Sequence, residues 1–430
     1  MLQMRQWWYP FAYPFTKVLS LSVTPTAISL SLYLLSRNFF RQYVVSPICC
    51  PSRASLLTGL YVHNHKTVNN SLHGGCYGEH WRKNMQDRTF ANLLKNAGYQ
   101  TFYAGKYLNE VTGGPSVVPS GWSEWHGLVG NSVYYNYTMS NNGLLDYRTS
   151  IFLQRDLAVS YIENQTESAP FLMVLAPPAP HQPFTPAPRH VDKYLNVSAI
   201  RSPNFNVSDK HWLLRMPPSP LPASMLPELD RVYRQRWEAL LAVDEMVADV
   251  INTLETTALL DNTYVIYTSD NGYHVGQFSQ VYDKRQPYES DIKVPLLMKG
   301  PGIKPNTVGA SPVLNIDIAP TILQLAGFTH DKMDGSAIDV ECYPEYDCKC
   351  QDSINNTYAC IRHIGNRIDM KYCEFNDHEE FVEMYDLHKD PFELYNAVNE
   401  VLPGRINTKK SILKLLYKFI FVQRLKSLVL

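Results

Sequence analysis

The sequence predicts an α/β fold: a doubly wound, mostly parallel sheet flanked by helices, followed by a smaller cysteine-rich α+β subdomain. Short apolar runs alternate along the chain with segments of helical period, which is the pattern of repeated βα units. Each run ends in polar residues, as expected where parallel strands reach a ligand-binding edge. The chain has 430 residues, of which 45% are hydrophobic, so a disordered protein is excluded and a large core is expected.

Three apolar runs are predicted to be buried strands of this sheet, at residues 99–104, 171–176 and 264–268. Because the carboxyl ends of parallel strands lie at one edge, we expect the polar residues that follow them to meet there. Those residues are Lys106, His181, Asp270 and Asn271.

Helices are expected between the strands, at residues 89–97, 231–254 and 317–326. Thr89 is suited to cap the first helix, and Gly98 to end it. Apolar residues recur through 231–254 near the helical period, which predicts that this helix packs one face against the sheet.

The most specific pattern in the chain is the string Cys49-Cys50-Pro51-Ser52-Arg53. It begins a predicted helix, whose N-terminal N–H groups and dipole favour an anion. Arg53 adds a positive charge about one turn later. The simpler alternative is an ordinary buried cysteine ahead of a helix.

This C-x-P-S-R string, followed by Thr58-Gly59, resembles the signature of the sulfatase family, in which the first cysteine is oxidised to formylglycine. The resemblance implies an alkaline-phosphatase-like fold and a sulfuric ester hydrolase, with Cys49 as the precursor of the nucleophile. It further implies that Arg53 holds the hydrated aldehyde.

Three further elements resemble sulfatase motifs and follow in the family's order. They are Gly105-Lys106, the proline-rich loop that carries His181, and Asp270-Asn271-Gly272 with Lys284. The resemblance implies that Lys106 and Lys284 bind the sulfate and that His181 protonates the leaving sugar oxygen. It also implies one calcium ion held by Asp270, Asn271 and the formylglycine at Cys49.

Several longer strings are similar to the glucosamine-6-sulfatase branch of the family, among them residues 105–109, 134–138 and 269–278. This implies removal of 6-O-sulfate from N-acetylglucosamine in heparan sulfate and keratan sulfate. Two alternatives stay open within the family: a catalytically impaired sulfatase-like protein, and an extracellular heparan 6-O-endosulfatase. A phosphate-ester hydrolase of the same superfamily would want a serine or threonine nucleophile and two metals, so Cys49 speaks against it.

Three histidines, His63, His65 and His274, are candidate substrate-binding residues with less specific signals. In a sulfatase arrangement the first two flank the pocket, and His274 contacts the sugar. Surface-loop or structural roles are equally compatible with the sequence.

Cysteines and sequons place the chain on the secretory route. Most of the eight cysteines lie between Cys342 and Cys373. With Cys49 modified and Cys50 left free, Cys76 and this cluster can form three disulfides. Glycosylation is expected at the asparagines of the N-x-S/T sequons: Asn69, Asn136, Asn164, Asn196, Asn206 and Asn355. The expected destination is the lysosome, with secretion as the alternative.

We divide the chain into an unassigned segment at 1–40, a catalytic domain at 41–335, a shortened cysteine-rich subdomain at 336–403 and a basic apolar tail at 404–430. Residues 1–40 contain no aspartate or glutamate. Sulfatases begin with a strand that ends in paired aspartates, two of the calcium ligands. We therefore expect a gap in the sheet and an activity below what the motifs indicate.

The net charge of −1 excludes nucleic-acid binding as the main function, because phosphate neutralisation needs a basic excess. The expected partners are a sulfated glycosaminoglycan substrate and, during maturation, the formylglycine-generating enzyme. We expect no membrane association other than through the two ends, and a homodimer stays open.

Overall fold

The computed structural model describes residues 36–39, 41–109, 116–148, 153–166, 169–301, 303, 305–309, 312–328, 358–365, 368–375 and 379–399. The domain boundaries expected at 335/336 and 403/404 lie outside the described residues, as do residue 40 of the 40/41 boundary and the basic tail.

One half of the central sheet has five strands in the order β6-β5-β4-β3-β7. The strands are β3 (Gln100–Gly105), β4 (Glu124–Leu128), β5 (Tyr137–Asn141), β6 (Leu144–Arg148) and β7 (Phe171–Ala176). β3 pairs in parallel with both β4 and β7, as predicted for this sheet. β4 pairs antiparallel with β5, and β5 with β6. Asn142 and Gly143, both with positive φ, join β5 and β6 in a tight hairpin.

The other half has four strands in the order β13-β1-β12-β8. They are β1 (Arg37–Phe39), β8 (Val265–Thr268), β12 (Leu296–Lys299) and β13 (Thr307–Gly309). β12 pairs antiparallel with both β1 and β8, whereas β1 and β13 pair in parallel, so both halves are mixed. Short pairings lie beside it, formed by β2 (Gln42–Tyr43), β9 (His274–Val275), β10 (Tyr282–Asp283), β11 (Lys293–Val294) and β14 (Val313–Leu314).

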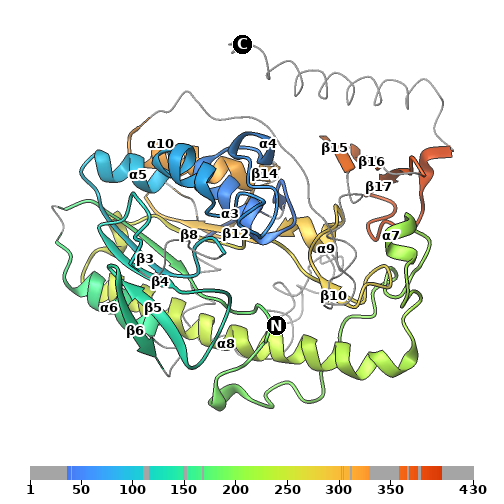
Figure 1. The fold of residues 1–430 in the computed structure, drawn as a ribbon, viewed down its shortest axis with the longest axis horizontal. Helices are drawn as coiled ribbons and strands as arrows, with labels where there is room; N and C mark the ends of the chain where they lie inside the picture. Colours follow the sequence, from blue (N-terminus) through green and yellow to red (C-terminus); the bar gives the residue numbers. More distant parts are fainter. Residues whose placement is uncertain are drawn as a thin grey trace, which may run out of the picture.

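Helices cover both faces of the sheet, which confirms the predicted α/β layering (Figure 1). On one face lie α6 (Leu153–Glu163) and α8 (Leu226–Thr256); on the other lie α3 (Cys49–Thr58), α5 (Phe90–Asn96) and α10 (Ile318–Leu325). Shorter helices are α4 (Val62–His65), α7 (Trp212–Arg215) and α9 (Glu289–Ile292). The Thr89 side chain caps α5 by accepting from the backbone N–H of Asn92 at 3.3 Å. Among the described helices, none combines the length and apolar character needed to cross a membrane.

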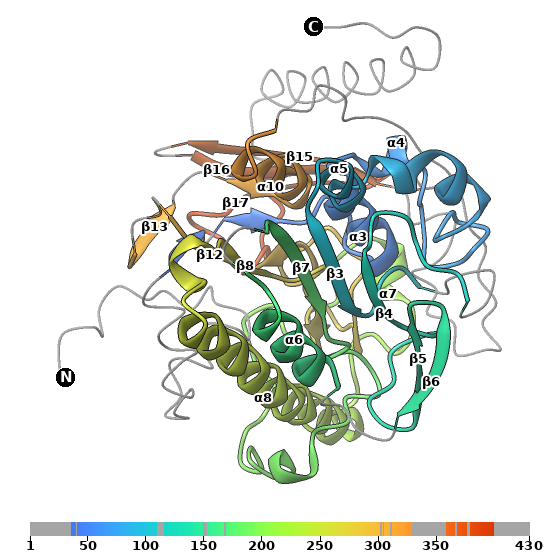
Figure 2. The same cartoon turned by 90° about the vertical axis from the view of Figure 1, so that its left-hand side faces the viewer.

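The two halves of the sheet meet at β7 and β8, which follow one another across the molecule (Figure 2). Within the described residues, β7 pairs only with β3, and β8 pairs only with β12. Their facing edges therefore lack strand partners in the described part of the chain. Residues 1–35 lie outside the described residues, so the gap expected from the sequence of the N-terminal segment stays a prediction.

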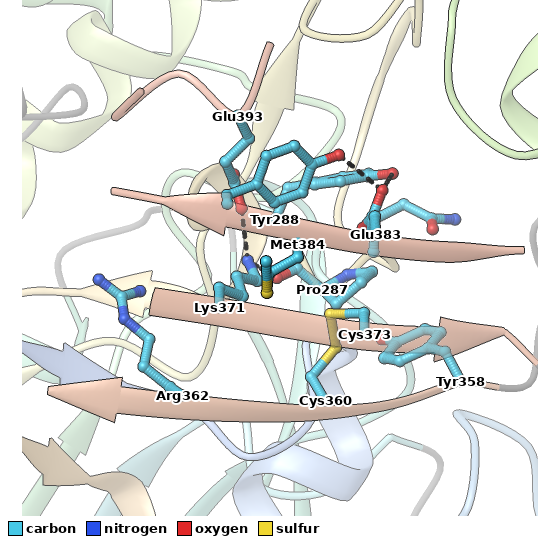
Figure 3. Close-up of a disulfide and its surroundings, with 12 residues drawn as sticks. Pro287, Tyr288, Tyr358, Cys360, Arg362, Lys371, Cys373, Glu383, Met384 and Glu393 are labelled. Atoms are coloured by element: carbon cyan, nitrogen blue, oxygen red, sulfur yellow. Dashed lines mark hydrogen bonds and ion pairs between the residues drawn. A yellow bond between two sulfur atoms is a disulfide. The ribbon is translucent and has the colours of Figure 1, made fainter. Parts of the chain in front are cut away.

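A separate antiparallel sheet, β15-β16-β17, forms the C-terminal subdomain. Its strands are β15 (Tyr358–Gly365), β16 (Ile368–Phe375) and β17 (Val382–Asp386). A disulfide between Cys360 and Cys373 joins the first two strands, and charged side chains lie buried beside it (Figure 3). Lys371 Nζ donates to Glu393 Oε1 at 2.7 Å, and Tyr385 donates to Glu383 Oε2 at 2.7 Å. Burial raises the pKa of Glu383 to about 7.

Candidate active site

Cys49 is the first residue of α3, as the sequence predicts, and its side chain is 1% exposed. It is a free cysteine. Burial by itself raises the pKa of the thiol, but the nearby cations Lys284, Arg53 and Lys106 oppose this, and the pKa is lower than the ordinary value. The surroundings of Cys49 therefore favour negative charge.

Arg53, one turn into α3, connects this helix to the loop after β8. Its guanidinium donates to Asp270 Oδ2 at 2.7 Å and to Asn109 Oδ1 at 2.6 Å. Ser52 donates through its hydroxyl to the Asp270 carbonyl. Asn109 was not recognised from the sequence as a site residue, although it follows Lys106 by three positions on the same loop.

Lys106 follows β3 directly, and its backbone N–H donates to the carbonyl of Ala176 at the end of β7. Its Nζ donates to Asn131 Oδ1 at 2.7 Å and to Ser132 Oγ at 2.9 Å. Burial, with a further contribution from Arg53, lowers the pKa of Lys106 to about 7. Neither Asn131 nor Ser132 was singled out from the sequence, because their loop carries no family string used above.

His181 and Lys284 face each other from two loops. His181 Nδ1 lies 2.7 Å from the Gln182 carbonyl, so this nitrogen carries the proton, and Nε2 lies 3.5 Å from Lys284 Nζ. Burial and the charges of Lys284 and Lys106 lower the pKa of His181 to about 2. Its imidazole is therefore neutral at acidic pH when no anion lies between these cations.

A cavity of about 820 Å³ joins these side chains. All the predicted catalytic and metal-binding residues line it: Cys49, Arg53, Lys106, His181, Asp270, Asn271 and Lys284. The cavity continues between β7 and β8 as an apolar slot, with α8 on one face and α3, α5 and α10 on the other. The polar site thus lies at one end of this slot.

Two oxygen donors at this end suit a calcium ion. Asn271 Oδ1 is buried without a hydrogen-bond partner, and the Asp270 carboxylate lies in the adjacent position of the chain. Calcium takes six to eight oxygen ligands. The described residues contain no group of three or more His, Cys, Asp or Glu side chains that could hold a metal ion. Asp270 and Asn271 therefore fit part of a calcium shell.

The expectation that Cys50 stays free is wrong, because Cys50 forms a disulfide with Cys76. The Cα atoms of the two residues lie 5.9 Å apart, within the range a disulfide spans. The side chains of these two adjacent cysteines thus have different surroundings: Cys50 is bonded to Cys76, and Cys49 lines the cavity. Cys342, Cys348 and Cys350 lie outside the described residues.

The three candidate substrate-binding histidines are not among the described residues that line the cavity. His65 is fully buried, and its Nε2 lies 2.9 Å from Ser55 Oγ. His274 is 1% exposed, with Nδ1 2.9 Å from Asp291 Oδ1. Both side chains make contacts within the protein, and their substrate-binding role stays a prediction. His63 is half-buried, and its ring stacks on Tyr61.

The sequons differ in accessibility. Asn136, Asn164 and Asn196 are exposed, although the Asn164 side-chain amide donates to the Ser160 carbonyl at 2.7 Å, and Asn69 is half-buried. The Asn206 side-chain amide donates to the Leu221 carbonyl at 3.1 Å and accepts from its N–H at 2.5 Å, so its nitrogen is already engaged. Asn355 lies outside the described residues.

Comparisons with known proteins agree with this geometry. The profile of the Sulfatase family matches residues 26–328, and that of the N-sulphoglucosamine sulphohydrolase C-terminal region matches 276–418. The chain is 42% identical to N-acetylglucosamine-6-sulfatase of Homo sapiens, over 88% of this chain and 79% of the relative. It is 42% identical to a putative extracellular sulfatase Sulf-1 homolog of Caenorhabditis elegans, over 67% of this chain and 42% of that protein.

Solved structures share the fold. A putative sulfatase from Bacteroides fragilis superposes with a TM-score of 0.70 at 20% identity, covering 94% of this chain and 92% of the other. A protein solved in complex with its substrate D-glucosamine-2-N,6-O-disulfate gives 0.68 at 22% identity, covering 92% of each chain.

Proposed function

The chain belongs to the sulfatase family, a family of sulfuric ester hydrolases, and we propose that it removes 6-O-sulfate from N-acetylglucosamine in heparan sulfate and keratan sulfate. The observation that carries this proposal is the meeting of Arg53, Lys106 and Lys284 around the buried thiol of Cys49. Such a ring of cations complements a sulfate ester. The choice of sugar rests on the 42% identity with N-acetylglucosamine-6-sulfatase.

The proposed roles follow from the contacts. Lys106 and Lys284 bind sulfate oxygens, and a sulfate between them offsets the charges that lower the pKa of His181. His181, oriented through Nδ1 by the Gln182 carbonyl, then delivers a proton from Nε2 to the leaving oxygen. Conversion of Cys49 to formylglycine would supply the nucleophilic oxygen. Calcium held by Asp270 and Asn271 would neutralise charge on the sulfate.

We also propose that the chain travels the secretory route to the lysosome, and that the formylglycine-generating enzyme is its partner during maturation. The Cys50–Cys76 and Cys360–Cys373 disulfides and the exposed sequons at Asn136, Asn164 and Asn196 support this route.

The test combines chemistry at Cys49 with turnover. The full chain is secreted from eukaryotic cells, and the peptide around Cys49 is analysed by mass spectrometry for an aldehyde in place of the thiol. Desulfation is measured on a terminal 6-sulfated N-acetylglucosamine, for the wild type and for Cys49→Ala. A Cys50→Ala/Cys76→Ala double variant is the control, because it removes the neighbouring disulfide and spares Cys49. An unmodified Cys49, or equal turnover in wild type and Cys49→Ala, contradicts the proposal.

One observation favours a second candidate function. The described residues offer only part of a calcium shell around Asp270, and within them the facing edges of β7 and β8 have no strand partner. An incomplete calcium shell beside an intact cluster of cations fits a catalytically impaired protein that still binds sulfated glycans. It would bind 6-sulfated oligosaccharides without releasing sulfate, even with formylglycine present. The endosulfatase alternative is tested by measuring sulfate release from internal and from terminal 6-sulfated residues. An endosulfatase releases the internal sulfates, and an exo-enzyme releases only the terminal ones.

A further inference from the structure

Arg236, on α8, is a buried cation at the cavity wall to which no role has been given. It is 9% exposed and forms no ion pair with any residue the structure describes. Its guanidinium donates one hydrogen bond, to the Pro180 carbonyl at 2.9 Å. Burying a charge without a carboxylate partner is costly, so the contacts it does make need an explanation.

Those contacts lead to the two loops of the site. Pro180 directly precedes His181, so the hydrogen bond from Arg236 fixes the backbone from which the imidazole projects. On its other side, the guanidinium carbon lies 3.8 Å from the ring centroid of Tyr273. Tyr273 follows the Asp270-Asn271-Gly272 loop, and Lys284 Nζ lies 5.3 Å from the same ring.

The tyrosine ring therefore has a cation on two approaches, one from α8 and one from the loop that carries Lys284. A planar guanidinium can stack on a ring while it donates in its own plane, which a lysine ammonium cannot do. Tyr134 donates to the His181 carbonyl at 2.6 Å and holds the same loop from a third direction. Arg236 thus ties the histidine loop to the ring beside Lys284.

We infer that Arg236 is a positioning residue. It holds His181 in place through the Pro180 carbonyl, and Lys284 through the Tyr273 ring, so that both side chains face a bound sulfate. The inference rests on the proposed function for the identity of the bound group. It assigns Arg236 no contact with the sulfate itself. Its effect is geometric, through the Pro180 carbonyl and the Tyr273 ring.

The experiment measures the affinity of the full chain for inorganic sulfate by calorimetry, which requires no turnover. Arg236→Met and Tyr273→Leu each remove the stacked contact and should weaken sulfate binding about tenfold or more, the loss expected when a charged donor is misplaced. Tyr273→Phe keeps the ring and should stay within about twofold of wild type. Arg236→Lys keeps the charge but loses the planar stack, so its sulfate affinity should lie between those of wild type and Arg236→Met. Arg234→Met, on the same helix, is the matched control, since Arg234 contacts the carbonyl of Val197 instead.

Repeating the sulfate titrations at high salt distinguishes a positioning role of Arg236 from long-range attraction between its charge and the sulfate. A misplaced lysine stays misplaced in about 0.5 M NaCl, whereas a lost long-range attraction is screened there. If the tenfold loss disappears at high salt, or if Arg236→Lys binds as wild type does, Arg236 acts through its charge and the inference is wrong. Equal losses in Arg234→Met, or normal binding in Arg236→Met, also overturn it.

Thermal melting checks the fold of every variant. If Arg236→Met does not fold, the comparison of Tyr273→Phe with Tyr273→Leu decides, and equal affinities there overturn the inference. A wild-type chain without measurable sulfate affinity overturns it as well. A chain that binds sulfate in the predicted pattern but leaves 6-sulfated N-acetylglucosamine intact refutes the proposed function and leaves the inference standing.

Discussion

The slot between β7 and β8 predicts that this chain gains stability and calcium when a strand is supplied to fill it. The perturbation replaces residues 1–35 by a strand of six apolar residues ending in Asp-Asp, joined to Ser36 by a crossover of about a dozen residues. The strand matches β7, which has six residues, and runs parallel to it. Its carboxyl end would then lie beside Asp270 and Asn271, where the cavity holds the polar site.

The expected magnitude follows from the slot. Ordering six residues costs about 6–12 kcal/mol. Burying about four apolar side chains against the helices on both faces offsets this cost, at about 1.5–3 kcal/mol each. The net gain comes from new backbone hydrogen bonds along the two open edges, at about 1 kcal/mol each, or ~5 kcal/mol together. With an unfolding entropy of about 2.1 cal/mol/K per residue over 430 residues, this gain raises the melting temperature by about 5 °C.

The assay compares three proteins: the chain as it stands, the Asp-Asp version, and a version whose strand ends in Ala-Ala. Melting temperature, bound calcium and desulfation are measured for each. Both added strands should raise the melting temperature, but only the Asp-Asp strand should raise calcium content and turnover, because it supplies the anionic ligands. Equal calcium and equal turnover in the unmodified and Asp-Asp proteins would refute the reasoning. An acid not yet identified would then complete the site.

Three further predictions concern single side chains, in the Asp-Asp protein. Lys106→Ala and Lys284→Ala should each lower kcat/KM on 6-sulfated N-acetylglucosamine by about 10²-fold, as for a lost oxyanion donor, and a change below about threefold would contradict this. His181→Ala should slow the sugar substrate more than an activated aryl sulfate; equal losses would make His181 a binding residue. Glu383 has its pKa raised from 4.5 to about 7, so it stabilises the fold below about pH 4.5 and this contribution is lost as the pH rises through about 7. Glu383→Gln should therefore flatten the decline in melting temperature between about pH 5 and pH 7.5. An unchanged slope would contradict the raised pKa of Glu383.

The parts of the fold that could be predicted are those with a local physical signal. An apolar run that ends in a proline-rich loop located β7 without error, and the threonine cap located the start of α5. The hairpin of β5 and β6 was missed, although Asn142-Gly143 is a strong turn signal. Its strand β6 exposes Leu144 and Leu145, so the usual alternation of buried apolar and exposed polar residues is absent.

The site residues, too, were predictable only where the neighbouring sequence carries a signal. Residues in family strings, such as Lys106 and Asp270, were found because their neighbours in sequence identify them. Their partners were not, because Asn131 and Arg236 reach the site from distant loops and helices and nothing in their own surroundings is distinctive. The free thiol expected of Cys50 was wrong for the opposite reason. Cys50 is next to Cys49 in sequence, yet folding directs its side chain to Cys76.

The burial of Cys49 imposes an order on the events of biosynthesis. A side chain that is 1% exposed at the start of a packed helix, next to a disulfide that holds the neighbouring residue, is closed to any enzyme once folding is complete. If Cys49 is converted to formylglycine, as proposed, the converting enzyme would therefore have to act before the chain is fully folded.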